Sequence, residues 1–308
     1  MNAATARALK DKLARPTKTH NHGVDEFPHF TEIWSYGEGS TKAVRIAVEG
    51  IIMREASSGF LSPRQNMVDS ALAQIRAAQA DDDVKAIIVD VDSPGGGITA
   101  SDEIYRALMM FRSSAEGRVV IIFMRDLAAS GGYYVSMAGD WIIAQPTTVV
   151  GSIGVIMQSI NMKGLSEKIG ISDVTIKSGA NKDLLNPFND VDPSQRELLQ
   201  GMINNMYEHF LNIVQENRQI PMEELRPLAD GRIFVADQAL SLELVDQIGY
   251  WEDVMEKTKE LLGVDSVKVI RYEQPVDFKK WLMSIRNPIQ PANWLSQLRS
   301  RFLYLWQP

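Results

Sequence analysis

The sequence predicts an α/β protein built on a mostly parallel sheet. Three runs of β-branched and other apolar residues, at 43–53, 85–92 and 118–124, are typical of buried strands. Two turns of very small residues, SPGGG and AASGG, follow the second and third runs, and helical patterns separate the runs. The repeated order of strand, glycine turn and helix predicts parallel strands whose carboxyl ends meet at one edge of the sheet. Binding and catalytic sites of α/β proteins concentrate at this edge.

Each expected strand in the first half is followed by an expected helix. After the first strand, Ser62 can cap a helix, Pro63 suits its first position, and apolar residues recur at helical spacing to about Ala80. The strand over 85–92 runs into the SPGGG turn and then into a helix that we expect to be capped near Ser101.

The third strand leads through AASGG into a short expected helix over 133–138, and short strands follow in WIIAQ and TVVGSIGVIM. A long helix is predicted over 193–218, because Asp192 can cap it, Pro193 suits its first position, and apolar residues form one stripe. The stripe consists of Leu198, Leu199, Met202, Ile203, Met206, Phe210, Ile213 and Val214. Further helices are expected around 222–228, 235–242 and 251–262, before a last strand over 267–271.

The two ends differ from the organised region over 43–272. Residues 1–42 are polar and lack periodicity, so we expect a flexible N-terminal arm. The tail over 273–308 is basic and aromatic. Within this tail a helical face is expected, with arginines opposite it, which suits either contact with a membrane surface or docking on a neighbouring subunit. That face consists of Leu295, Leu298, Phe302 and Leu305.

Composition narrows the functional classes. The 308 residues carry a formal charge of −7, which disfavours nucleic-acid binding, and no cysteine, which excludes disulfides and thiolate metal sites. His20, His22 and His29 fall in the polar arm and are interpreted as solvated, so no metal or cofactor is expected. Without an apolar run of about 18 residues or a secretory signal, the chain as written is expected to be cytoplasmic. A missing upstream anchor, or a tail that binds the bilayer, would instead make it membrane-associated.

Ser130 in AASGG is the candidate nucleophile, and it needs a base. A Ser-His-Asp triad is disfavoured because the histidines lie in the arm or, for His209, in the long helix. The G-x-S-x-G pattern is also absent, since Ala128 occupies its first position. A lysine can serve if burial lowers its pKa from about 10.4 to near 7, at a cost of about 4 kcal/mol. The segment IKSGANKD offers Lys177 and Lys182.

Acyl transfer also needs N–H donors for the oxyanion, usually where no Cβ blocks the approach. SPGGG supplies such a turn, and Gly131, directly after the candidate nucleophile, supplies a second donor at a helix N-terminus. SPGGG alone is better interpreted as a tight turn. Its pairing with AASGG one strand later favours a catalytic site.

Five motifs in order, DSPGGG, DLAASGGYYVSMAGD, GSIGVIM, IKSGANKD and ADGRIFVADQALSLELVDQIG, resemble the signal peptide peptidase A family over about residues 43–262. That family comprises serine endopeptidases (peptidase family S49) of the crotonase/Clp-protease-like fold, with repeated strand-strand-helix units and extra C-terminal helices. The resemblance implies Ser130 as nucleophile, Lys182 as general base, and an oxyanion hole from Gly131, Gly96 and Gly97. It also implies that Ser152 orients the lysine.

One departure from the family pattern falls at Glu243, where the family tends to have the helix-terminating glycine of LGLVD. The function implied is hydrolysis of peptide bonds through an acyl-enzyme, on signal-peptide remnants or unfolded polypeptides, by a ring-shaped homo-oligomer. Three alternatives stay open: an acyl-CoA enzyme on the same fold, a non-catalytic oligomeric scaffold, and a phage capsid-maturation protease with the same Ser/Lys dyad.

Overall fold

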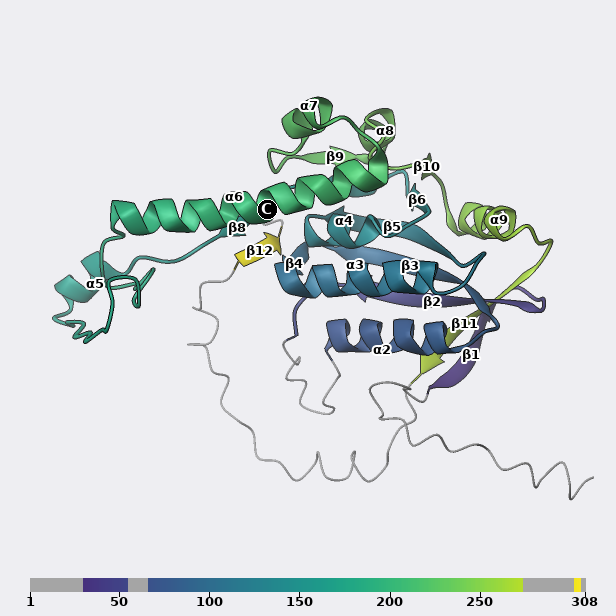
Figure 1. Cartoon of the computed structure of the whole chain (residues 1–308), viewed down its shortest axis with the longest axis horizontal. Helices are drawn as coiled ribbons and strands as arrows, with labels where there is room; N and C mark the ends of the chain where they lie inside the picture. Colours follow the sequence, from purple (N-terminus) through teal and green to yellow (C-terminus); the bar gives the residue numbers. More distant parts are fainter. Residues whose placement is uncertain (1–29, 55–65, 274–301, 306–308) are drawn as a thin grey trace, which may run out of the picture.

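A mostly parallel sheet lies at the centre of the computed structural model, which describes residues 30–54, 66–273 and 302–305 (Figure 1). In this part of the chain the sheet has nine strands, with the main path β1-β11-β2-β3-β5-β6-β10 and with β7 and β9 beside β5. The pairs β1·β11 and β7·β9 are antiparallel, and the others are parallel. The strands are β1 (Thr31–Tyr36), β2 (Thr41–Glu49), β3 (Val84–Ser93), β5 (Val119–Ala129), β6 (Trp141–Ala144), β7 (Val149–Gly151), β9 (Ile233–Val235), β10 (Gln247–Ile248) and β11 (Val267–Glu273).

Helices cover both faces of this sheet, which explains why its central strands read as continuous apolar runs. Successive side chains of β3 point to opposite faces. Ile87 and Val89 join the larger core, which includes residues of α2 (Met67–Ala80), α3 (Ile98–Ser113) and α4 (Gly131–Ser136). Ile88 joins the second core beneath α9 (Trp251–Leu262). The predicted α/β class with a mostly parallel sheet is confirmed.

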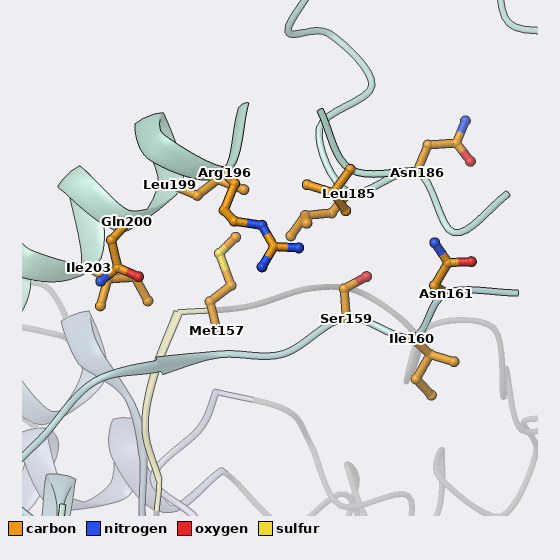
Figure 2. A pocket seen from close by; sticks show the side chains of 11 residues that line it. Met157, Ser159, Ile160, Asn161, Leu185, Asn186, Arg196, Leu199, Gln200 and Ile203 are labelled. Atoms are coloured by element: carbon orange, nitrogen blue, oxygen red, sulfur yellow. The ribbon is translucent and has the colours of Figure 1, made fainter. Parts of the chain in front are cut away.

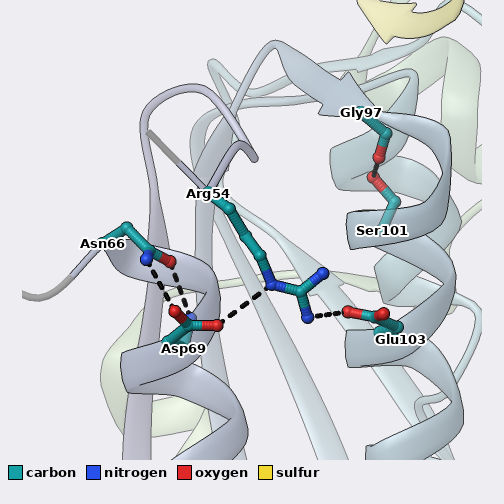
Figure 3. Close-up of polar contacts among 6 residues, drawn as sticks. All are labelled: Arg54, Asn66, Asp69, Gly97, Ser101 and Glu103. Atoms are coloured by element: carbon teal, nitrogen blue, oxygen red, sulfur yellow. Dashed lines mark hydrogen bonds and ion pairs between the residues drawn. The ribbon is translucent and has the colours of Figure 1, made fainter. Parts of the chain in front are cut away.

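Helices α2 and α3 begin at residues other than those expected. α2 begins at Met67 and is capped by Asn66, whose side chain accepts a hydrogen bond from the Asp69 N–H at 2.9 Å; Ser62 and Pro63 lie outside the described residues. α3 begins directly after Gly97. Ser101 does not cap it, because its hydroxyl donates to the Gly97 carbonyl one turn back (Figure 3).

Arg54 ties the starts of these two helices together. Its guanidinium contacts Asp69 of α2 at 3.0 Å and also Glu103 of α3 (Figure 3). These side chains are close to half exposed, so the contribution of each pair to the free energy of unfolding is small. Their effect is geometric: they join the start of α2 to the start of α3, the helix that follows the glycine turn.

The last part of the expected N-terminal arm is a strand. Residues 31–36 form β1, which pairs antiparallel with β11 at the edge of the sheet. The side chains of β1 are mostly exposed, so the alternation that would have indicated a strand is weak. Residues 1–29 lie outside the described part of the chain.

Residues 158–202, here called the extension, lie to one side of the sheet and contain α5 (Lys163–Lys168) and the first part of α6 (Pro193–Arg218) (Figure 1). The predicted bounds of α6 are confirmed, and Asp192 caps it by accepting from the Ser194 N–H at 2.8 Å. The predicted apolar stripe divides into two parts. Phe210, Ile213 and Val214 are buried against the core, whereas Leu198 and Met202 are exposed.

The C-terminal helices α7 (Met222–Leu225) and α8 (Ala236–Ser241) follow α6, with a short 3-10 helix at Arg226–Leu228. The turn after α8 closes although Glu243 stands where the family pattern has a glycine. Glu243 itself adopts a left-handed backbone with φ 59°, and the Leu244 N–H closes the turn on the Ala239 carbonyl at 2.8 Å.

A second, three-stranded sheet contains residues 302–305 of the tail. β12 (Phe302–Leu305) lies between β4 (Gly95–Gly97) and β8 (Ile156–Met157) and is antiparallel to both. The helical face predicted for the tail is therefore wrong for residues 302–305, since backbone pairing with two strand edges outweighs the helical spacing. Leu295 and Leu298 lie outside the described residues.

Candidate active site

Ser130 lies where β5 ends and α4 begins, at the carboxyl edge of the sheet. Its backbone is strained, with φ 53° and ψ −113°. Two hydrogen bonds hold it: its N–H donates to the Gly151 carbonyl at 2.7 Å, and its carbonyl accepts from the Tyr134 N–H at 2.8 Å. Positive φ at a residue other than glycine costs about 1–3 kcal/mol, and such residues cluster at functional sites.

The glycines after Ser130 are required by close packing against the SPGGG turn. A Cβ on Gly132 would lie 2.8 Å from the Ser93 carbonyl oxygen. A Cβ on Gly131 would lie 2.5 Å from the Ser101 hydroxyl and 3.0 Å from the Gly96 nitrogen. The two small-residue motifs, one strand apart in the sequence, therefore pack directly on each other.

The SPGGG turn also determines where the backbone N–H groups of Gly96 and Gly97 point. Gly97 donates its N–H to the Ile52 carbonyl at 2.8 Å, and the Ile52 N–H donates to the Gly95 carbonyl at 2.9 Å. Because backbone groups alternate along a strand, the Gly96 N–H points to the side opposite Ile52. Gly96 and Gly131 can thus supply two neighbouring donors for an oxyanion. Gly97, which was expected to join them, has its N–H directed to Ile52.

A cavity of about 500 Å³ adjoins the serine. Ser130 and Ser152 both line it, together with Ile156 of β8 and Asn204 and Tyr207 of α6. Ser152 has φ 52° and lies directly after β7, where its N–H donates to the Arg232 carbonyl at 2.7 Å. Two serines with positive φ, which follow the adjacent strands β5 and β7, thus line one cavity, and the role of Ser152 in orienting the lysine stays a prediction.

Lys182 does not lie at this cavity. It is exposed and belongs to the extension, where the Gln195 side chain donates to the Ala180 carbonyl at 3.0 Å. The helix from Gln195 to Asn204, which lines the Ser130 cavity, measures about 14 Å at about 1.5 Å per residue. A general base must lie within about 3 Å of the proton that it takes. Within one copy of the chain, the structure therefore does not bring Lys182 to Ser130.

The other candidate lysine, Lys177, forms an ion pair with Asp183. The Lys177 amine lies 2.7 Å from a carboxylate oxygen of Asp183.

A smaller cavity of about 270 Å³ lies between this part of the extension and α6 (Figure 2). Figure 2 shows the Arg196 side chain pointing into it from α6, between Met157 and Leu185. Ile203 lines both cavities, so they are neighbours along the helix.

A polar cluster near the serine was missed by the sequence analysis. The Tyr134 hydroxyl donates to Asp102 at 2.7 Å and lies 3.1 Å from Nε2 of His209. Burial, with the hydrogen bond to Asp102, raises the pKa of Tyr134, so its phenol is neutral. His209 therefore has a partner on α4, one turn after Ser130. The position of Tyr134 in DLAASGGYYVSMAGD was a usable signal, but Asp102 and His209 come from distant segments.

The described residues contain no group of three or more His, Asp or Glu side chains that could hold a metal ion. Nor does any helix among them combine the length and the hydropathy that crossing a bilayer requires.

The family model for Peptidase family S49 matches residues 112–265, half of the chain, and the model for Clp protease matches residues 54–151. A relative from Enterococcus faecium assigned as a signal peptide peptidase, SppA, is 36% identical over 77% of this chain and 68% of its own. A relative from Synechocystis assigned as a protease is 35% identical over 77% of this chain and 80% of its own.

Other matches cover smaller shares or are more distant. Protease 4 of Salmonella typhi is 31% identical over 84% of this chain but only 41% of its own length. The solved structure of a ClpP1 mutant from Listeria monocytogenes aligns with 68% of this chain and 92% of that chain, at 15% identity and a TM-score of 0.45. The Clp protease match, with the parallel sheet, confirms the predicted Clp-protease-like fold. The chain belongs to peptidase family S49 and is a serine protease.

Proposed function

We propose that the protein hydrolyses peptide bonds through an acyl-enzyme on Ser130, with Lys182 as the general base. The observation that carries this proposal is the strained Ser130 at the edge of a 500 Å³ cavity, beside the N–H groups of Gly96 and Gly131. A hydroxyl held in this way is placed for attack without rearrangement of the backbone. Donors already aimed at a developing oxyanion are among the largest single contributions to catalysis.

The reaction has two halves. The Ser130 oxygen attacks the scissile carbonyl carbon while a neutral Lys182 amine takes its proton, and the oxyanion accepts hydrogen bonds from Gly96 and Gly131. The protonated lysine then gives that proton to the leaving amine as the C–N bond breaks. Water, deprotonated by the same amine, hydrolyses the ester and releases the serine.

Lys182 would reach the serine of a second copy of the chain. In one copy Lys182 does not line the Ser130 cavity, and about 14 Å of α6 lies between Gln195, which bonds the Ala180 carbonyl, and Asn204 at that cavity, a span too long for proton transfer. Large apolar side chains are exposed on the extension, and exposed apolar patches of this kind mark interaction surfaces. They include Ile160, Leu165, Ile169, Ile171, Val174, Ile176, Leu198 and Met202. A ring-shaped homo-oligomer would cover this surface and bring the lysine of one copy to its neighbour's serine.

The substrates proposed are unfolded polypeptides, including signal-peptide remnants. The residues around Ser130 are alanine and glycine, so an extended chain can lie close to the backbone. β4 lies beside the serine, and an extended segment, β12, pairs with its edge in this structure, so a polypeptide substrate can pair there by the same backbone hydrogen bonds. The assignment of the Enterococcus relative as a signal peptide peptidase points to the same class of substrate.

Casein cleavage by the full chain tests the nucleophile. Wild type should cleave casein between pH 6 and 10 and should be labelled by a fluorophosphonate, whereas Ser130→Ala should lose cleavage by at least about 10³-fold and take up no label. The alanine variant should unfold at the same temperature as wild type. Wild-type rates in a folded Ser130→Ala would exclude Ser130 as the nucleophile.

A further inference from the structure

The smaller cavity, at Arg196, continues the cavity at Ser130. Both lie between α6 and the segment over residues 154–161, which contains β8. Residues 154–156 of this segment line the Ser130 cavity, and residues 157 and 159–161 line the smaller one. On the helix, the Gln200 amide in the smaller cavity donates to the side chain of Asn204 in the larger one at 2.8 Å. The two cavities are therefore parts of one groove.

The smaller cavity carries a positive charge. Among the described residues that line it, only Arg196 is charged. The Arg196 guanidinium forms no ion pair or hydrogen bond with any residue in the described part of the chain. Two carboxylates of the extension have lysines of their own: Asp183 contacts Lys177 at 2.7 Å, and Asp190 contacts Lys163. Because a guanidinium stays charged in proteins, Arg196 is available to an anionic ligand.

A second polar group lies opposite Arg196. Ser159 lines the other wall of the cavity, on the segment that follows β8 (Figure 2). Its hydroxyl has no hydrogen-bond partner among the described residues. A guanidinium binds a carboxylate through two parallel N–H groups, and a hydroxyl can donate to the same oxygen atoms. Arg196 also lies in the first turn of α6, where the helix dipole favours a negative charge. These groups together suit a carboxylate.

The span of α6 between the two cavities indicates where on a peptide this carboxylate would lie. From Arg196 to Asn204 the helix measures about 12 Å, at about 1.5 Å per residue. An extended polypeptide advances about 3.3 Å per residue, so it covers the same span with about three or four residues. A peptide whose scissile bond lies at Ser130 would therefore bring a residue about three or four positions away to Arg196.

We propose that Arg196, with Ser159, binds a carboxylate of the substrate polypeptide about three or four residues from the scissile bond. This inference rests on the proposed function, because the position is counted from the bond that Ser130 attacks. Arg196 would bind and position the peptide without taking part in proton transfer. The core of a signal peptide is apolar and its start is basic, so such a site favours unfolded polypeptides over signal-peptide remnants.

A glutamate scan tests the position. The full-length protein would be given uncharged fluorogenic peptides, blocked at both ends, in which one glutamate is moved residue by residue on both sides of the cleaved bond. Peptides with glutamine at the same positions are the controls. We expect kcat/KM for Glu to exceed that for Gln by about tenfold at three or four residues from the bond on one side, mainly through KM. A peptide that ends there with a free carboxylate shows whether a chain end serves equally. Equal rates for Glu and Gln at every position would overturn the inference.

Charge reversal tests whether Arg196 is the group that binds. Arg196→Gln should bring the Glu-to-Gln ratio at that position close to one, and Arg196→Glu should favour a peptide with lysine there. Ser159→Ala should lower the ratio by a smaller factor. Arg106→Gln, which changes an exposed arginine of α3, is the matched control and should keep the wild-type ratio. If Arg196→Gln slows all peptides alike and shifts sedimentation to smaller species, Arg196 contacts a neighbouring copy, and the inference fails.

Binding to a variant without the nucleophile separates this inference from the proposed function. Fluorescence anisotropy of labelled Glu and Gln peptides with Ser130→Ala measures Kd without cleavage, and we expect the Glu peptide to bind about tenfold more tightly. If Ser130→Ala is inactive but binds both peptides equally, the serine mechanism stands and the carboxylate site fails. If a folded Ser130→Ala cleaves like wild type, the proposed function fails, while the two Kd values still decide whether the groove binds a carboxylate.

Discussion

The neighbourhood of Ser130 and the extension are built in opposite ways. Around the serine, glycines are packed so tightly that a Cβ on Gly132 would meet backbone at 2.8 Å, and Ser130 itself is only 1% exposed. In the extension, no atom lies within 4 Å of the Cβ position on Gly179 or Gly201, and Ile176 is 97% exposed. One region is completed by its own chain, whereas the other presents surface that a single copy does not cover.

This difference separates the two halves of the proposed catalytic pair. The proposed nucleophile, Ser130, and the proposed oxyanion donors, Gly96 and Gly131, are positioned by β4, β5 and α4 within one copy. Lys182 belongs to the open region and is exposed in one copy. The amine would become a base only when a neighbouring copy removes it from water, since burial disfavours the charged form. Assembly would then switch the peptidase on.

The largest expected effect on casein cleavage comes from substituting Lys182, one of the two lysines of IKSGANKD. Lys182→Ala should lower kcat for casein by at least about 10³-fold, because a serine without its base is a weak nucleophile. Lys177→Ala is the matched control: it removes an exposed lysine five residues away that is paired with Asp183, and its effect should stay within a few-fold. Should the two variants show reversed effects, the base would be Lys177.

The next largest effect is expected on the free energy of unfolding, where glycine substitutions in the two regions should act in opposite directions. Gly132→Ala should destabilise the protein by about 1–3 kcal/mol and disturb Ser130, because its Cβ has no space. Gly201→Ala lies within α6 with open surroundings and should stabilise the fold by up to about 1 kcal/mol. Thermal unfolding of both variants measures this. Equal loss of stability in both would mean that the extension is already closely packed in one copy.

Substitutions of Leu198 and Met202, two exposed apolar residues of α6, test whether copies of the chain assemble through this face. Leu198→Lys combined with Met202→Lys should shift the protein to smaller species in sedimentation velocity and lower casein cleavage by about tenfold or more, because charges at an apolar interface cost several kcal/mol. Leu240→Lys, on the exposed side of α8, is the control and should leave the assembly intact. A double variant that assembles and cleaves like wild type would place the interface elsewhere.

Ser152 should give the smallest catalytic effect. If its hydroxyl orients Lys182, Ser152→Ala and Ser152→Gly should both lower kcat by about tenfold, the loss expected for one hydrogen bond. Only the glycine variant relieves the left-handed backbone at φ 52°, so it alone should gain stability. If Ser152→Gly kept full activity, the Ser152 hydroxyl would not orient Lys182, and the residue would matter only for the local backbone conformation.

Much of the fold could be predicted from the sequence, because its central elements carry strong local signals. Pro193 and Asp192 define the start of α6, and the β-branched run 118–124 indicates β5. β1 was missed since its exposed side chains show no alternation, and β12 was predicted as helix since leucine spacing suited one. Both are strands only because other strands pair with them, and pairing partners cannot be seen in a local pattern.

Part of the spatial arrangement at the candidate site could be predicted from the sequence, whereas the roles of its residues stay predictions. Gly131, directly after Ser130, packs beside Gly96, in keeping with the pairing of SPGGG and AASGG. The use of the Gly97 N–H by Ile52 depends on a backbone contact between segments about 45 residues apart, which no motif encodes. The distance from Lys182 to Ser130 was also beyond the sequence, because motif order says nothing about whether one copy or two supply the residues.

Mixing two inactive variants tests the central claim most directly. Ser130→Ala keeps Lys182, and Lys182→Ala keeps Ser130, so a shared assembly contains sites with an intact serine from one copy and an intact lysine from its neighbour. Equal mixing, with subunit exchange verified by native mass spectrometry, should restore about one quarter of wild-type casein cleavage in a symmetric ring. Mixed assemblies that form but remain inactive would contradict a base supplied by a neighbouring copy.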